Sequence, residues 1–419
     1  MAFGTACAVI TAACSGSSAP TRAVPHRPPP TTRPNPAADG HLALGALEPT
    51  TGPVSAVAPA FTIPVQLAVD EMNLAGGVRG QPVTLTVADD GSAVATGRAA
   101  LTTLVRDHHV DAVIGPSSSE VAAALMPELV TDRVVMCSGS NTSGALSTID
   151  SGGYYFRTAP PDRLQAVALA RLVAANHQRR PFVLAPADGV DVRFRDQVVT
   201  ALRAAGMRPT VARPAAWRTD AALTAALTRA QADGIVLLGV PSSIAPVLRT
   251  LVAIGKGPQQ IPTYGNDSLE SADLGAAVDA ARGYVVTGLR GTTPAGAPGG
   301  IDHPFTARMA ATGTDPFFSA SAYDCAILVG LAAIAGGADD ADAIRTHLPA
   351  ILRGARDCST FADCAARLRR RETIHYRGAF SRFDRWQRFE PGSGTYDTWT
   401  MGLDAHPVLG AATDQIHVG

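Results

Sequence analysis

Two hydroxyl-rich segments end apolar runs in the first third of the chain. Residues 115–119 (GPSSS) close the run VDAVIG, and residues 138–142 (SGSNT) follow RVVMC. Hydroxyl groups and free backbone N–H groups suit a small anion, most simply a carboxylate, because hydrogen bonds to a charged oxygen are strong. The same residue types also cap helices and form turns, which is their commonest role. Both interpretations stay open for each turn taken alone.

These two segments need strands and a helix to position them. The runs at 110–115 and 133–137 predict β-strands, and the stretch EVAAALMPELV between them has apolar residues at helical spacing. Strand, helix and strand in this order predict a parallel βαβ unit. Ligands bind beyond the carboxyl ends of the strands in such sheets, so we expect the two turns to lie together at a binding site.

Strand and helix patterns alternate along the chain from residue 41 onward. This alternation predicts an α/β protein with two doubly wound lobes, joined by several crossings, and a ligand cleft between the lobes. The predicted strands are 41–47, 82–90, 110–115, 133–137, 181–186, 234–240, 261–267 and 283–289, the last as a return crossing, followed by a β-rich tail at 374–401. The predicted helices of the first and last parts are 58–74, 94–107, 119–131, 303–312, 318–336 and 340–354.

Length and charge bound the possible functions. The 419 residues suffice for two ordinary domains, and 46% of them are hydrophobic. The formal net charge of -1 gives no reason to expect a nucleic-acid partner.

The N-terminus has the composition of an export signal. Residues 2–13 are apolar or small, and residues 11–14 (TAAC) resemble the lipobox of bacterial lipoproteins, which implies lipidation of Cys14. Two features depart from such a signal: the usual basic segment is absent, and Thr11 stands where the lipobox usually has Leu. Residues 15–40 are rich in Ser, Pro and Thr and predict a tether. No later segment has the uninterrupted apolar length that we expect of a membrane-spanning helix.

Cysteine usage fits an exported protein. Cys358 and Cys364 lie six residues apart and predict a disulfide, with metal binding as the alternative. Cys137 and Cys325 stand in apolar surroundings and are expected to be buried thiols. The pair His108-His109 lies beside charged residues and is expected to be solvated, so we expect no metal and no cofactor.

Several segments have the order and spacing of landmarks of one family. They are HLALGALEPTTGP at 41–53, LAVDEMNLAGGVRGQPVTLTVADD at 67–90, VDAVIGPSSSEVA at 110–122, GGYYFRTAPPD at 152–162, the Ala322-Tyr323-Asp324 helix, and the Tyr376-x-Gly turn before Phe383-Asp384. Through these segments the chain, from about 41 to 403, resembles the type I periplasmic binding proteins of branched-chain amino acid ABC transporters. The resemblance implies Rossmann-like lobes that close on a ligand.

The resemblance also implies roles for individual residues. Ser117, with Ser118 beside it, would bind the α-carboxylate of the ligand. The next turn would bind carboxylate and ammonium through backbone and hydroxyl groups. Asp267 on the second lobe would neutralise the ammonium, with an N-cap as its alternative role. The implied binding residues are Ser117, Ser118, Ser140, Asn141, Thr142, Asp267 and Tyr323.

The wall of the expected pocket departs from the family. Aromatic residues usual in the family are missing after the first Gly-Pro turn at 54–58, at 188–191, and after the strand that ends at 239–241. The departures indicate a ligand unlike leucine or valine, or a protein that has lost transport. Asp188 or Asp191 could bind a polar or cationic group of the ligand, or both could be loop residues without a ligand contact.

These observations predict an organisation and a function. We expect a signal at 1–14, a tether at 15–40, lobe 1 from 41–159 plus 287–355, lobe 2 from 160–286 plus 374–403, and a disulfide-bearing segment at 356–373. Hinges near 160 and 286 would close the cleft. The expected function is that of a monomeric, lipid-anchored, extracytoplasmic solute-binding protein that delivers an amino acid or related carboxylate to an ABC permease.

The sequence leaves two other classes of function to consider. A ligand sensor with the same fold is the main alternative. An enzyme is disfavoured because Gly-x-Ser-x-Gly, Gly-x-x-x-x-Gly-Lys-Ser/Thr and Gly-x-Gly-x-x-Gly are all absent from the sequence.

Overall fold

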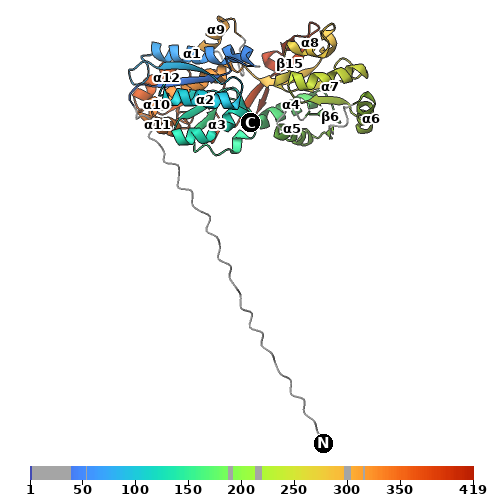
Figure 1. Ribbon diagram of the computed structural model, residues 1–419, viewed down its shortest axis with the longest axis horizontal. Coiled ribbons are helices and arrows are strands. Elements are labelled where there is room, and N and C mark those ends of the chain that lie inside the picture. Colours follow the sequence, from blue (N-terminus) through green and yellow to red (C-terminus); the bar gives the residue numbers. More distant parts are fainter. Residues whose placement is uncertain (2–38, 53, 187–191, 213–218, 297–302, 315–316) are drawn as a thin grey trace.

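The computed structural model describes residue 1 and residues 39–419, except 53, 187–191, 213–218, 297–302 and 315–316. Cys14, the signal and the tether therefore lie outside the described residues, and so do Asp188 and Asp191. The described chain forms two lobes side by side, each with a sheet and packed helices (Figure 1). The predicted α/β class is thereby confirmed.

The first lobe is built on a parallel sheet with the strand order β2-β1-β3-β4-β5. Parallel pairing aligns the carboxyl ends of the strands: Glu48 at the end of β1 lies opposite Asp89, and Ile114 at the end of β3 lies opposite Cys137. The strands are β1 (Ala43–Glu48), β2 (Thr84–Asp89), β3 (Ala112–Ile114), β4 (Val135–Ser138) and β5 (Tyr155–Arg157).

Helices from both ends of the chain complete this lobe. Residues of α1 and α10 share one apolar core with the sheet strands, and α2 packs beside α3. The helices are α1 (Ala58–Leu74), α2 (Val94–Arg106), α3 (Ser119–Asp132), α9 (Pro304–Ala310), α10 (Ser319–Gly336), α11 (Ala341–His347) and α12 (Phe361–Arg369). Two short pairs, β11 (Arg356–Cys358) with β12 (Ile374–Tyr376) and β13 (Trp386–Gln387) with β14 (Glu390–Pro391), lie outside both main sheets.

The second lobe contains a mixed sheet with the order β16-β15-β10-β9-β8-β6-β7, in which β17 also pairs with β15. Two apolar clusters pack in this lobe. The strands are β6 (Pro181–Leu184), β7 (Thr210–Val211), β8 (Gly234–Leu237), β9 (Thr263–Gly265), β10 (Arg290–Pro294), β15 (Gly394–Met401), β16 (Pro407–Leu409) and β17 (Ile416–Val418). The helices are α4 (Asp162–Ala175), α5 (Val192–Ala204), α6 (Asp220–Ala230), α7 (Pro241–Ala253) and α8 (Asp273–Val278).

The boundary between the lobes differs from the expected one. Residues 283–286 form a 3-10 helix rather than the start of a strand, and the strand in this region is β10, at Arg290–Pro294. Because β10 pairs with β9 and β15, it belongs to the second sheet, whereas we expected residues 287–355 in the first lobe. Residues 374–386 in turn contribute Ile374, Tyr376 and Trp386 to the first core. The chain therefore passes between the sheets after β5, after β10 and before β15.

The expectation of free thiols at Cys137 and Cys325 was wrong. These residues form a disulfide that joins β4 to α10, with their Cα atoms 5.6 Å apart. The expectation failed because 188 residues of sequence separate two cysteines that only the packing of α10 on the sheet brings together. The second disulfide joins Cys358 to Cys364.

Helix α10 contradicts the expectation that no later segment has the apolar length of a membrane-spanning helix. Among the described residues it is the one helix with the length and hydropathy of a membrane span, at 18 residues and a mean hydropathy of 1.5. Of that span, 83% is buried inside the protein. In this structure α10 is therefore the central core helix of the first lobe.

Candidate functional site

The turns after β3 and β4 are joined by hydrogen bonds. The Ser138 hydroxyl donates to the Pro116 carbonyl at 2.9 Å, and the Ser140 hydroxyl donates to the Ser117 carbonyl at 3.2 Å. Asn141 is fully buried, and its Nδ2 donates to both of those carbonyls, at 2.9 and 3.0 Å. The structure thus brings the two turns together at the carboxyl edge of the sheet, as parallel pairing requires.

Some of the expected binding residues are committed to this framework. Ser118 is the N-cap of α3 and accepts from the backbone N–H of Val121 at 3.3 Å. Asn141 accepts from the Tyr155 hydroxyl through Oδ1 at 3.2 Å, so both polar atoms of its side chain have protein partners. Ser118, Ser140 and Asn141 therefore hold the two turns together, and Ser117 and Thr142 stay predicted ligand contacts.

Thr142 lies where the two lobes meet. Its side chain is partly buried. Its carbonyl accepts from the backbone N–H of Asp162, the first residue of α4, at 2.8 Å. Two residues further on, a Cβ on Gly144 would lie 2.9 Å from Nε2 of Gln197 on α5. The second turn of the first lobe therefore faces helices α4 and α5 of the second lobe.

A buried ion pair between Arg157 and Glu390 stabilises this turn. Arg157 at the end of β5 donates through Nη1 to the carbonyls of Asn141 and Ser143, at 3.0 Å each. Its Nε donates to Glu390 at 3.0 Å, and Arg163 of α4 reaches the same carboxylate at 3.3 Å. Glu390 consequently links the turn of one lobe to a helix of the other.

Asp267 follows β9 at the carboxyl edge of the second sheet. Its carboxylate accepts from the backbone N–H of Ser268 at 2.9 Å and from Asn266 Nδ2 at 3.4 Å. Burial raises the pKa of Asp267, while hydrogen bonds from Gln165 and from these neighbours oppose that rise. The N-cap alternative does not describe Asp267, because the residue lies inside a 3-10 helix whose N-cap is Asn266.

Tyr323 has a different place from the one expected of a ligand contact. Its side chain is fully buried in the first core, and its hydroxyl donates to Glu71 of α1 at 2.7 Å. Its ring packs on Phe305 with centroids 4.5 Å apart. The structure therefore gives the side chain of Tyr323 a packing role, although the backbone of its neighbour Ala322 lies against Gly139 of the second turn.

Tyr396 is a candidate that sequence reasoning missed. It lies on β15 at the crossing between lobes, is fully buried, and its hydroxyl has no hydrogen-bond partner among the described residues. Burial raises the pKa of Tyr396, Asp162 and Asp267 add to the rise, and Arg163 and Arg157 oppose it. A buried hydroxyl without a partner is rare in folded proteins, which makes Tyr396 a candidate residue of the region between the lobes. No local sequence pattern around residue 396 signals this.

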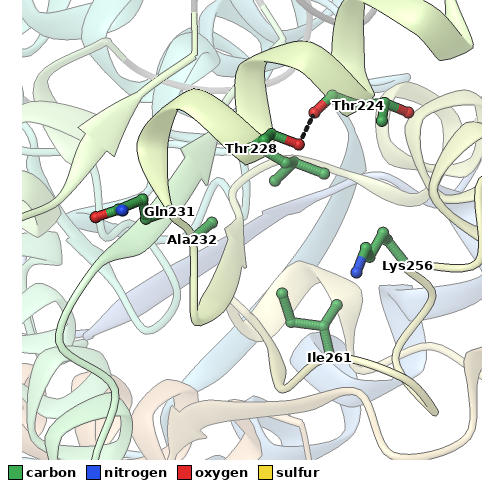
Figure 2. A pocket seen from close by; sticks show the side chains of 7 residues that line it. Thr224, Thr228, Gln231, Ala232, Lys256 and Ile261 are labelled. Atoms are coloured by element: carbon green, nitrogen blue, oxygen red, sulfur yellow. Dashed lines mark hydrogen bonds between the residues drawn. The ribbon is translucent and has the colours of Figure 1, made fainter.

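A pocket of about 150 Å³ lies elsewhere in the second lobe (Figure 2). It is lined by α6 side chains, including Thr224 and Thr228, and by Lys256 and Ile261. Ile261 precedes β9 and the end of α6 precedes β8, so the pocket lies at the amino ends of these strands. It is on the opposite edge of the sheet from Asp267, and we do not assign it to the candidate site. Among the described residues, no group of three or more His, Cys, Asp or Glu side chains is arranged to hold a metal.

A two-lobed α/β fold with polar turns at the carboxyl ends of its sheets is typical of a protein that binds a small ligand at those ends. The family model for periplasmic binding proteins matches residues 42–375, so the chain belongs to that family. The resemblance seen in the sequence is thereby confirmed. Its relatives are substrate-binding proteins of transporters rather than enzymes.

Individual relatives agree with this assignment. The Leu/Ile/Val-binding protein BraC3 of Rhizobium johnstonii is 28% identical over 321 residues, which are 75% of this chain and 84% of the relative. A leucine-binding protein of Thermotoga maritima has a TM-score of 0.67 at 17% identity, over 90% of this chain and 98% of that one. The branched-chain amino acid binding protein LivJ of Streptococcus pneumoniae, solved with isoleucine, has a TM-score of 0.62 at 21% identity, over 88% and 100% of the two chains. At these identities the two solved structures show the fold alone.

Proposed function

We propose that this protein captures an amino acid or a related small carboxylate outside the cytoplasm and delivers it to an ABC permease in the membrane. The proposal is supported by the placement of hydrogen-bond donors on the first lobe and of a carboxylate on the second. Ser117 and Thr142 lie at the carboxyl edge of one sheet, and Asp267 lies at the carboxyl edge of the other. Hydroxyl and N–H donors complement a carboxylate, and Asp267 complements an ammonium group. The names of its relatives support an amino acid as the ligand.

Binding by closure follows from this division of groups between two lobes. A ligand held by the Ser117 and Thr142 turns alone would leave its ammonium without a counter-charge, so full affinity needs the second lobe to approach. The crossings after β5, after β10 and before β15 are the segments that would bend. No covalent chemistry is required. We further propose that the protein acts as a monomer and that Cys14 carries the lipid that holds it at the cell surface.

A thermal-shift screen tests the proposed ligand class. Residues 39–419 are screened against the common amino acids, short peptides and small carboxylates. A ligand at about a thousand times its dissociation constant stabilises the folded state by about 4 kcal/mol, so a true ligand should raise the melting temperature by several degrees. Ser117→Ala should reduce this shift for the same ligand, because it removes a donor to the carboxylate. Ser271→Ala, which changes a partly buried serine just before α8, serves as the control.

The same screen separates the alternatives. An absence of any shift with every amino acid and carboxylate would contradict the proposed ligand class. A sensor with this fold would give the same shift as a transporter component, and reconstitution with a permease distinguishes those two functions.

A further inference from the structure

Charge is distributed unevenly along the chain, and one segment of the first lobe is strongly basic. Residues 353–388 hold ten Arg and four Asp or Glu, a formal net charge of +6, although the whole chain has a formal net charge of -1. This segment contains β11, α12, β12 and β13. Figure 1 shows α12 beside α10 and α11, on the side of the first lobe that faces away from the second lobe.

The arginines of this segment gather around the β11–β12 pair. Arg356 lies on β11, which pairs with β12, and Arg370 and Arg371 lie between α12 and β12. Arg377 follows β12, and its Nη1 donates to the carbonyl of Arg382 at 3.5 Å. We call this group the basic surface, and it consists of Arg356, Arg370, Arg371, Arg377 and Arg382.

Part of the basic surface has no internal partner. Arg370 and Arg377 are ion-paired with neighbouring carboxylates. Arg356, Arg371 and Arg382 are exposed and have no ion-pair partner in the part of the chain that the structure describes. The dipole of α12 favours basic residues at its C-terminal end, but it does not account for Arg356 or Arg382, which lie on other elements. These three cations are therefore available to an anionic partner.

The basic surface adjoins the place where the N-terminal segment enters the fold. The backbone N–H of Gly40 donates to Oδ2 of Asp339 at 2.9 Å, and Arg79 pairs with the same carboxylate at 3.3 Å. Two residues before Arg79, the carbonyl of Gly77 accepts from Nη2 of Arg369, the last residue of α12, at 3.2 Å. The end of α12 thus lies next to the loop that holds Gly40. An anchored N-terminal segment would keep this part of the fold within reach of the membrane.

The acidic groups near Gly40 do not cancel the basic surface. Asp339 is fully buried, and Asp111 is 6% exposed. Asp340 is the N-cap of α11, and its carboxylate accepts from two backbone N–H groups of that helix. Asp39 is the exposed acid of this group. Most of the negative charge at this end of the lobe is therefore turned inward, whereas the arginines of the basic surface face solvent.

We propose that the basic surface binds the anionic phospholipid headgroups of the membrane in which the protein is anchored. This inference rests on the anchoring that is part of the proposed function. Clusters of arginine close to a membrane are attracted to anionic lipids, and the planar guanidinium can bind two phosphate oxygens at once. Docking by the first lobe would leave the second lobe, at the other end of the molecule, free to move toward a ligand (Figure 1).

Sedimentation with lipid vesicles tests the proposal. Residues 39–419, which contain every described helix and strand, are mixed with vesicles of phosphatidylcholine alone or of phosphatidylcholine with an equal amount of phosphatidylglycerol. The wild type should bind the phosphatidylglycerol vesicles only, and about 0.5 M salt should abolish the binding by screening. The triple variant Arg356→Gln, Arg371→Gln, Arg382→Gln should bind about 100-fold more weakly, because each arginine near an anionic membrane contributes roughly fivefold.

A second triple variant controls for net charge. Arg203→Gln, Arg208→Gln, Arg229→Gln removes the same charge from exposed positions of the second lobe and should bind vesicles like the wild type, and thermal melting should show both variants folded. An equal loss in the two triple variants, or a wild type that does not prefer the phosphatidylglycerol vesicles, would overturn the proposal. A wild type that binds poly-L-glutamate but not the vesicles would overturn it in favour of an acidic protein partner. The assay uses neither Cys14 nor a ligand, so failure here leaves the proposed ligand capture to be judged by the thermal-shift screen.

Discussion

Replacing Cys137 and Cys325 by alanine should lower the free energy of unfolding by about 5 kcal/mol, against about 2 kcal/mol for the same replacement of Cys358 and Cys364. The two disulfides close loops of very different length, with sequence separations of 188 and 6. In the chain-entropy description, the stabilisation grows with the logarithm of loop length, which gives these two values. Guanidinium denaturation of residues 39–419 measures both double variants against the wild type.

The shorter disulfide is the matched control, because all four cysteines are buried and the same atoms are removed in each variant. Equal losses in the two variants would show that loop closure does not govern the contribution of the longer disulfide.

Arg157→Met should lower the free energy of unfolding by about 3–5 kcal/mol. The guanidinium is fully buried, and removing it strands the Glu390 carboxylate, which is 7% exposed, with Arg163 as its remaining ion-pair partner. Breaking a buried pair from one side has a cost of this size. The variant also frees the carbonyls of Asn141 and Ser143, so the turn that carries Thr142 should bind ligand more weakly.

Two comparisons make the Arg157 prediction specific. Arg98→Met breaks an exposed ion pair with Glu128 and should cost less than about 1 kcal/mol. The double variant Arg157→Met with Glu390→Met should be more stable than Arg157→Met alone, because it removes the stranded carboxylate. Urea denaturation reports all three values, and a double variant less stable than the single one would contradict this account of the ion pair.

The strands and helices with regular apolar spacing could be predicted from the sequence. The alternation of strands and helices is visible from residue 41, and residues 58–74 are the bounds of both the predicted and the observed α1. The two hydroxyl-rich turns were found because each directly follows an apolar strand. Their meeting at one sheet edge then follows from parallel pairing alone.

Other features depend on contacts that sequence spacing does not encode. The apolar run at 283–289 resembled a strand, whereas the more polar RGTTP segment forms β10 because it lies between β9 and β15, with Thr292 and Thr293 buried. Tyr323 matched a family landmark but packs in the core against Glu71. Glu48 ends β1, and its contact with the turn at Gly115 depends on the packing of two strands that sequence spacing does not encode.

The most direct test of the central claim is a calorimetric titration of the ligand that gives the largest thermal shift, or of L-leucine if several shifts are equal, into the wild type, Asp267→Asn and Asp273→Asn. Asp273 is an exposed acid in the first turn of α8 and serves as the control. We expect one ligand per chain in the wild type, the same affinity in Asp273→Asn, and at least a tenfold loss in Asp267→Asn, because the buried ammonium group would lose its counter-charge. Equal affinity in all three proteins would contradict a ligand held between the two lobes.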